Sequence, residues 1–253
     1  MNTVKVLVKK YWITACIFVG LIALYTYMTE TGQANPFLFP TVDAIGKAFA
    51  DNRETMVLNL FASFKLMIPS IFFSVLIALT VGTILGMNEK LREALHPVIY
   101  TFSVIPSILL SPFVLLLSPN FYVASIILIV YSTTWATLFA TITGIMTIDK
   151  RYLDKAATLE LKGIQKMTKI ILPAASPSIL SGFVNSLRST FIMLVYAEMY
   201  GAKYGMGFFV KKYSEFGIYS HTWAGFIFMV VVLVIVMQFF EHLKKRLLKW
   251  TIH

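Results

Sequence analysis

Charge and cysteine are both scarce in this chain. Only 13% of its 253 residues are charged, and Cys16 is its single cysteine. A soluble domain has about a quarter charged residues, so the composition excludes a soluble globular domain. One cysteine excludes an intrachain disulfide and a cysteine-rich metal site. The four histidines are scattered without zinc-ligand spacing, so we expect no metal site.

Motifs for nucleotide hydrolysis and intramembrane proteolysis are also missing. The nearest Gly-Lys pair, Gly46-Lys47, lacks the preceding glycine and the following hydroxyl residue of a phosphate-binding loop. The apolar stretches contain neither the Gly-x-Ser-Gly element of a rhomboid-like protease nor the Glu-Glu pair of an intramembrane metalloprotease. We therefore expect no catalytic residues and no bound cofactor in this chain.

Apolar residues dominate the sequence, at 58% of the chain, and the mean hydropathy is +0.76. Because a membrane helix needs about 20 apolar residues, the sequence predicts an all-α polytopic membrane protein with six transmembrane helices in one domain, 1–253. Pro106 and Pro112 are expected to kink or break the third run. The six predicted runs are 11–29, 58–87, 98–117, 121–147, 176–200 and 222–240.

Basic residues give the chain a formal net charge of +10. Such a charge could indicate nucleic acid, but its distribution favours membrane topology. With the N-terminus inside, cytoplasmic segments hold 15 of the 22 basic residues, including Lys5, Lys9 and Lys10. We therefore expect both termini in the cytoplasm and no nucleic-acid partner. Outside, 41–55 is predicted as a short helix on the membrane face, and the glycine-rich segment 201–221 as a loop or re-entrant turn.

The segment 149–175, between the fourth and fifth runs, is amphipathic. Its apolar residues recur at helical spacing, and basic residues occupy most other positions. This pattern predicts a helix on the membrane surface that ends at Pro173. Such a helix could bind only lipid headgroups, or a soluble partner could dock on it.

Several short motifs follow one another with the spacing of a known family. Together they resemble the permease subunit of a bacterial ABC importer, in the branch with taurine, alkanesulfonate, nitrate and thiamine-precursor transporters. Downstream of Ser63-Phe64-Lys65, the matching positions are Ile105-Pro106, Thr141, Gly144, Asp149, Asp154-Lys155-Ala156, Ile170, Leu172-Pro173, Ala197-Glu198, Gly205 and Gly207.

The resemblance implies a multi-pass protein of the bacterial cytoplasmic membrane that imports a small anionic or heterocyclic solute. Its implied partners are an ABC ATPase subunit that holds the ATP and Mg, an extracytoplasmic solute-binding protein, and a second permease copy in a homodimer within the lipid bilayer. The implied ATPase-coupling residues are Asp154, Lys155, Ala156, Ala157, Leu159, Glu160, Lys162 and Gly163.

Two residues of this coupling segment depart from the family pattern. Glu160 stands where the family has a glycine that permits a tight turn, and Lys155 replaces the first alanine. A glycine adopts positive φ at low cost, whereas glutamate does not. Gly163, three residues later, could instead carry the turn.

Polar residues within the predicted spans are candidates for the transport pathway. Arg188 lies near mid-depth, where a charge costs roughly 2.5–3.5 kcal/mol on insertion scales. It either faces the pathway and favours an anionic solute, or forms a structural pair with an acidic residue or a helix C-terminus. Glu198 is either a gate residue or part of the following turn. Thr133, Thr137 and Thr141 form one face of the fourth run, which either lines the pathway or packs tightly.

A self-contained oligomeric channel or secondary carrier is the alternative function. Such a protein needs no docking helix and should carry ion-coupling carboxylates within its spans. Glu198 is the single carboxylate of the six apolar runs. The sequence therefore favours the importer.

Overall fold

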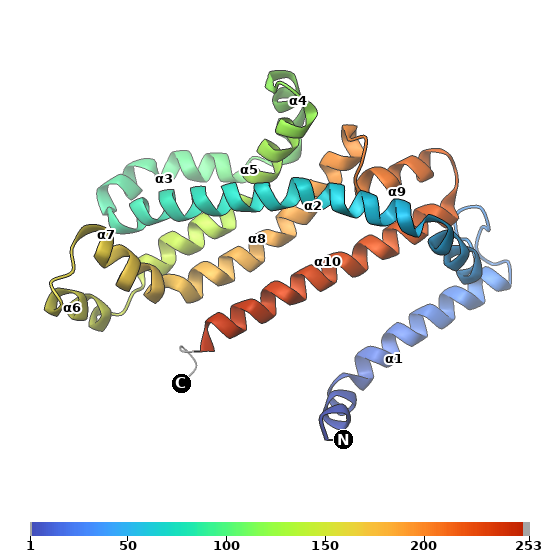
Figure 1. Cartoon of the computed structure of the whole chain (residues 1–253), viewed down its shortest axis with the longest axis horizontal. Coiled ribbons are helices and arrows are strands. Elements are labelled where there is room, and N and C mark those ends of the chain that lie inside the picture. Colours follow the sequence, from blue (N-terminus) through green and yellow to red (C-terminus); the bar gives the residue numbers. More distant parts are fainter. Residues whose placement is uncertain (1, 250–253) are drawn as a thin grey trace. The chain divides into compact units, whose positions relative to one another are not determined.

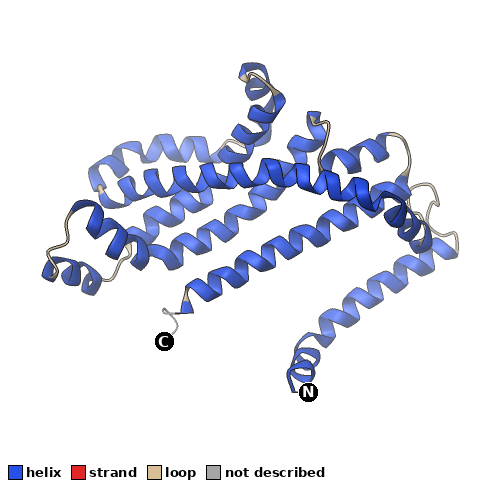
Figure 2. Ribbon diagram, in the orientation of Figure 1, coloured by secondary structure: helices blue, strands red, loops and turns tan. Residues whose placement is uncertain are grey.

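The computed structural model describes residues 2–249, and their side chains from residue 11 onward. Within these residues all regular structure is helical, joined by short loops (Figure 2). The predicted cytoplasmic side chains Lys5, Lys9 and Lys10 lie outside the side chains described. The helices are α1 Asn2–Glu30, α2 Val42–Met87, α3 Glu89–Val104, α4 Ser107–Leu117, α5 Phe121–Met146, α6 Lys150–Thr158, α7 Gly163–Lys166, α8 Leu172–Gly201, α9 Met206–Glu215 and α10 Tyr219–Leu247.

Five described helices are long and apolar enough to cross a membrane, or six if the bent α3–α4 pair counts as one span. The predicted all-α multi-pass architecture is therefore confirmed. The runs 11–29, 121–147 and 222–240 correspond to α1, α5 and α10. The direction in which the termini face stays a prediction.

The segment 41–55 is not a separate surface helix, as the sequence predicted, but the first part of α2. This helix runs without interruption for 46 residues, from Val42 to Met87. Ala48, Asn52 and Met56, each four residues apart, are at most 9% exposed and form a buried face. The segment is therefore packed against protein and extends the helix beyond the predicted run 58–87.

The third predicted run bends where Pro106 interrupts it. Helices α3 and α4 meet at 90° across Ile105 and Pro106. Ile105 has the extended backbone that a following proline favours. Pro112, in contrast, does not break α4. It cannot donate a backbone N–H to the carbonyl of Ile108, but the hydroxyl of Ser111 donates to that oxygen at 2.7 Å.

The segment 149–175 is not one amphipathic helix that ends at Pro173. It forms α6, a turn, α7 and a π-helical turn over Met167–Ile171, which continues into α8. Pro173 lies in the first turn of α8. It follows the π-helical turn, in which the backbone hydrogen bonds change register, and the helix continues through it. A helical stretch of 39 residues therefore runs from Gly163 to Gly201.

The chain divides into two compact units, residues 1–57 with 209–228 and residues 58–208 with 229–253. In the first unit, aromatic side chains join distant segments. Tyr25 Oη donates to the carbonyl of Pro40 at 2.7 Å, and Trp223 Nε1 donates to that of Leu38 at 2.9 Å. The segment 201–221, predicted as a loop or re-entrant turn, contains α9.

The second unit is built on α5 and α8, which lie side by side (Figure 1). Its main core joins these helices to α2 through Leu66, Ile129, Leu187 and Met193. Gly182 of α8 lies against Ala140 of α5, so the two backbones approach closely. Small residues allow such contacts between membrane helices.

Candidate functional site

Helix α6 begins with a charged cap. Asp149 Oδ1 accepts a hydrogen bond from the backbone N–H of Arg151 at 2.9 Å, and its Oδ2 lies 2.7 Å from Arg151 Nη2. The hydrogen bonds from the Arg151 side chain and backbone lower the pKa of Asp149 to about 2. The cap is therefore ionised at neutral pH, and it stabilises the N-terminus of α6.

A tight turn follows α6, and Glu160 is its left-handed residue, with φ +50°. The N–H of Glu160 donates to the carbonyl of Ala157 at 2.9 Å, and that of Leu161 to the carbonyl of Ala156 at 3.0 Å. This pair of bonds is the Schellman motif that ends many helices. Gly163 is also left-handed, with φ +53°. The turn therefore stands at the position where the family motif has glycine, and Gly163 adds a second turn.

The predicted coupling residues lie on this turn and on the helix before it. Asp154, Lys155, Ala157, Leu159, Glu160, Lys162 and Gly163 are exposed, and Ala156 is buried. Two large aliphatic side chains are also exposed, since Leu159 is 56% and Ile164 66% accessible. The α6–α7 turn thus presents apolar side chains among charged ones, as a docking surface for a soluble protein would.

Thr133 and Thr137, two of the three threonines predicted on one face of the fourth run, lie in the contact between α5 and α8, whereas Thr141 lies against Gly82 of α2. Thr133 Oγ1 is 2.8 Å from Thr190 Oγ1, and Thr137 Oγ1 donates to Ser186 Oγ at 3.3 Å. Thr141 donates to the carbonyl of Thr137 at 2.7 Å. All three threonines are at most 1% exposed. This geometry supports the packing interpretation, and their role in a pathway stays a prediction.

Glu198 lies in the last turn of α8, where its side chain contacts the turn between α8 and α9, and it is 1% exposed. Its Oε2 accepts from the N–H of Gly207 at 2.7 Å. Its Oε1 has no hydrogen-bond partner in the part of the chain that is described. The geometry therefore supports the turn interpretation of Glu198, and a gating role stays a prediction.

Two further side chains hold the same turn. Asn59 Oδ1 accepts from the N–H of Gly205 at 2.8 Å, and Ser63 Oγ accepts from that of Met206 at 3.0 Å. Together with Glu198, they bind three successive backbone N–H groups. Sequence reasoning missed this function of both residues. Ser63 belonged to a recognised motif, but nothing local marked Asn59.

Arg188 lies on an exposed face of α8. Ser181, Asn185, Arg188 and Ile192 are all exposed and recur at helical spacing. Arg188 forms neither an ion pair nor a side-chain hydrogen bond within the described residues. Because a bare guanidinium in lipid is costly, this face suits a water-filled path or a further protein surface, and a role in the pathway stays a prediction.

These features define a class, the multi-pass α-helical membrane proteins with an exposed helical segment between two spans. Within the described chain, no group of three or more His, Cys, Asp or Glu side chains could hold a metal ion. The chain belongs to the family of binding-protein-dependent transport system inner membrane components, which matches residues 70–249. The predicted family and the inner-membrane location are therefore confirmed.

Several similar proteins are named as permeases of the predicted branch, which includes the alkanesulfonate and taurine transporters. SsuC of Bacillus subtilis (strain 168), a permease protein named for aliphatic sulfonates transport, is 30% identical over 69% of this chain and 63% of its own length. The taurine transport system permease protein TauC of Escherichia coli (strain K12) is 25% identical over 78% of this chain and 71% of its own length. The chain thus spans less than two thirds of the Bacillus relative.

The fold is also found in a solved transporter. A chain of the MetNI methionine ABC transporter, in an inward-facing conformation, matches with a TM-score of 0.63 and 17% identity. The match covers 79% of this chain and 98% of the MetNI chain. At this identity the likeness shows a common fold.

Proposed function

We propose that this chain is the permease subunit of an ABC importer that moves a small anionic solute across the cytoplasmic membrane. A separate ATPase subunit docks on the α6–α7 turn, a solute-binding protein delivers the solute outside, and two permease copies form the pathway. The observation that carries this proposal is the exposed α6–α7 turn, whose left-handed Glu160 occupies the glycine position of the family motif. A channel or carrier would have no use for such a turn.

The connection between the turn and the span supports a mechanical role. From Gly163 the helical stretch continues through the π-helical turn to Gly201. Gly163 and Arg188 are 25 residues apart on it, about 37 Å at 1.5 Å per residue. When ATP closes the ATPase dimer, displacement of the turn would shift α8 as a rigid body and expose its Arg188 face alternately to the two sides.

The proposed solute class follows from Arg188 and from the names of the relatives. A guanidinium binds flat or tetrahedral oxyanions through paired N–H donors. The relatives carry the names of aliphatic sulfonates, taurine and nitrate, each of which has such an oxyanion. We therefore propose that Arg188 faces the pathway and attracts the anionic group of the solute.

Charge reversal at the turn tests the docking assignment. Asp154→Lys and Lys162→Glu should each lower uptake in cells at least tenfold and reduce co-purification of the ATPase, at unchanged expression. Lys245→Glu, an exposed lysine near the end of α10, is the matched control and should leave both unchanged. Normal uptake by both turn variants would show that the docking assignment is wrong.

Purification from the native host tests the proposal as a whole. The tagged chain, extracted in mild detergent, should co-purify with a Walker-motif ATPase that mass spectrometry identifies. A stable homo-oligomer without an ATPase would instead support the channel or carrier.

A further inference from the structure

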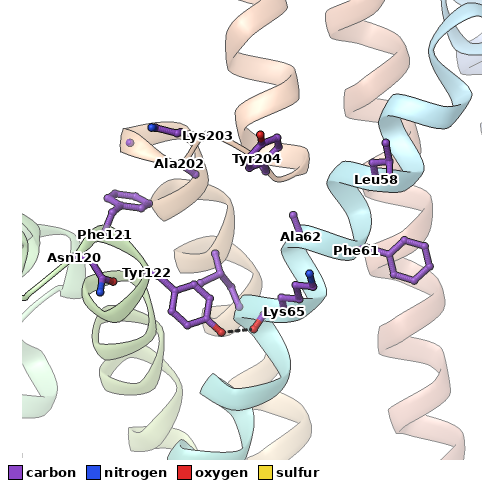
Figure 3. Close-up of a pocket in the computed structure, with 12 residues that line it drawn as sticks. Leu58, Phe61, Ala62, Lys65, Asn120, Phe121, Tyr122, Ala202, Lys203 and Tyr204 are labelled. Atoms are coloured by element: carbon purple, nitrogen blue, oxygen red, sulfur yellow. Dashed lines mark hydrogen bonds between the residues drawn. The ribbon is translucent and has the colours of Figure 1, made fainter.

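A cavity of about 690 Å³ opens between α2, the start of α5 and the end of α8 (Figure 3). Aliphatic and aromatic side chains form most of its walls, among them Leu58, Phe61, Phe121 and Tyr204. Tyr122 Oη donates to the carbonyl of Lys65 at 3.0 Å and so holds α2 against the start of α5. The cavity is therefore apolar, and a hydrogen bond joins the two helices, α2 and α5, that form two of its walls.

Two lysines line this cavity, Lys65 from α2 and Lys203 from the segment after α8 (Figure 3). Both side chains are exposed, and neither ammonium group forms an ion pair within the described residues. Two unpaired cations beside an apolar cavity fit a ligand that joins an anionic group to a hydrocarbon part.

The position along α2 places the cavity at a membrane surface. Lys65 and Met87, at the end of the helix, are 22 residues apart, about 33 Å at 1.5 Å per residue. The hydrocarbon core of a bilayer is about 30 Å thick. Lys65 therefore reaches one membrane interface when Met87 lies at the other. Tyr122 and Tyr204 line the same cavity as Lys65, and tyrosines are common at membrane interfaces.

A second cavity, of about 600 Å³, lies deeper along the same two helices. Phe73 and Ile77 of α2 and Ile127 and Val130 of α5 line it. Phe73 is eight residues from Lys65, about 12 Å deeper in the membrane. Half of the bilayer core is about 15 Å, so this depth is that of an acyl chain in one leaflet.

We propose that this surface binds an anionic phospholipid. Lys65 and Lys203 attract its phosphate, and its acyl chains lie along α2 and α5 at the depth of the two cavities. A phospholipid is favoured over a small transported anion because a second apolar cavity lies at acyl-chain depth along the same two helices. This inference does not rest on the proposed transport function.

Lipid titration of the purified, delipidated full chain tests the site. Native mass spectrometry should show tighter binding of phosphatidylglycerol than of phosphatidylcholine with identical acyl chains. Lys65→Gln and Lys203→Gln should each weaken phosphatidylglycerol binding about fivefold, since a lysine near an anionic headgroup contributes about that factor. Phosphatidylcholine binding should be unchanged. Lys212→Gln, an exposed lysine outside the cavity, is the matched control.

A second variant tests the apolar part. Ala62 lines the cavity, and Ala62→Trp should fill it and weaken the binding of both lipids without a change of charge. Equal affinity for the two lipids in the native chain would overturn the proposal, as would a double lysine variant that binds phosphatidylglycerol normally. Displacement of the bound lipid by hexanesulfonate would also overturn it and assign the cavity to a small organic anion.

Discussion

Glu160 holds a backbone conformation that an L-residue adopts at a cost of roughly 1–2 kcal/mol. Its φ of +50° closes the turn after α6, and two backbone hydrogen bonds fix the geometry. The strain sits in the segment proposed to dock the ATPase. A single residue thus keeps the family's turn without the family's glycine.

Replacement of this glutamate by glycine should stabilise the chain. Glu160→Gly should raise the free energy of unfolding by about 0.5–1 kcal/mol, because the relief of strain exceeds the added freedom of the unfolded chain. Reversible unfolding in mixed micelles measures this change. Glu160→Ala keeps the strain and should give no gain. An equal gain in both variants would mean that the side chain, and not the backbone, is the cause.

Gly205 should tolerate no side chain. It has φ +126°, and a Cβ there would overlap Cδ of the buried Glu198. Gly205→Ala should lower the free energy of unfolding by about 2–4 kcal/mol through backbone strain and overpacking. Gly46→Ala is the control, because a Cβ at that helical position would meet nothing within 4 Å. A stable Gly205→Ala protein would contradict the described turn.

At the scale of helices, the contact between α5 and α8 depends on small and hydroxyl side chains. Thr133 and Thr190 bond across it at 2.8 Å, and Ser178 Oγ donates to the carbonyl of Ala140 at 2.8 Å. In a membrane, close packing replaces the hydrophobic driving force between helices. The buried threonine hydroxyl groups of α5 thereby have hydrogen-bond partners within the chain.

A side chain that forces α5 and α8 apart should lower the free energy of unfolding. A Cβ on Gly182 would overlap Cβ of Ala140 and lie 2.8 Å from the carbonyl oxygen of Ala136. Gly182→Ala should therefore destabilise the protein by about 1–3 kcal/mol. Denaturant titration measures the loss, with Gly20→Ala on α1 as a control that meets no neighbour within 4 Å. Equal stability of the two variants would show that α5 and α8 do not pack this closely.

At the scale of the whole molecule, the exposed face around Arg188 needs a surrounding that the single chain does not provide. In the proposed homodimer, a second permease copy and a water-filled path between the copies would supply it. Assembly would then place the cation of each copy beside the solute.

Loss of this cation should abolish transport but not assembly. Arg188→Leu should lower uptake of the anionic solute at least tenfold, while the chain still co-purifies with its ATPase. Arg188→Lys should keep part of the activity, since it retains the charge but not the paired donors. Arg53→Leu, an exposed arginine outside the apolar runs, should transport normally. Unchanged uptake by Arg188→Leu would remove Arg188 from the pathway.

Local sequence patterns were sufficient for the class of the protein and for several spans. Apolar runs longer than a bilayer is thick allow few structures other than helices, and Pro106 imposed the bend between α3 and α4. The same rule, that proline ends or breaks a helix, gave wrong predictions at Pro112 and Pro173. The Ser111 hydroxyl donates to the carbonyl that Pro112 leaves without a donor, and Pro173 follows a π-helical turn through which the helix continues.

What the sequence by itself determined was therefore the membrane class, the family and most of the spans, because these depend on composition and on neighbours within a few residues. Only the tertiary structure decided that Glu160 is left-handed, that Thr133 packs on α8, and that Asn59 binds Gly205 across 146 residues of chain. Such contacts depend on which distant segments meet, and no local periodicity specifies that.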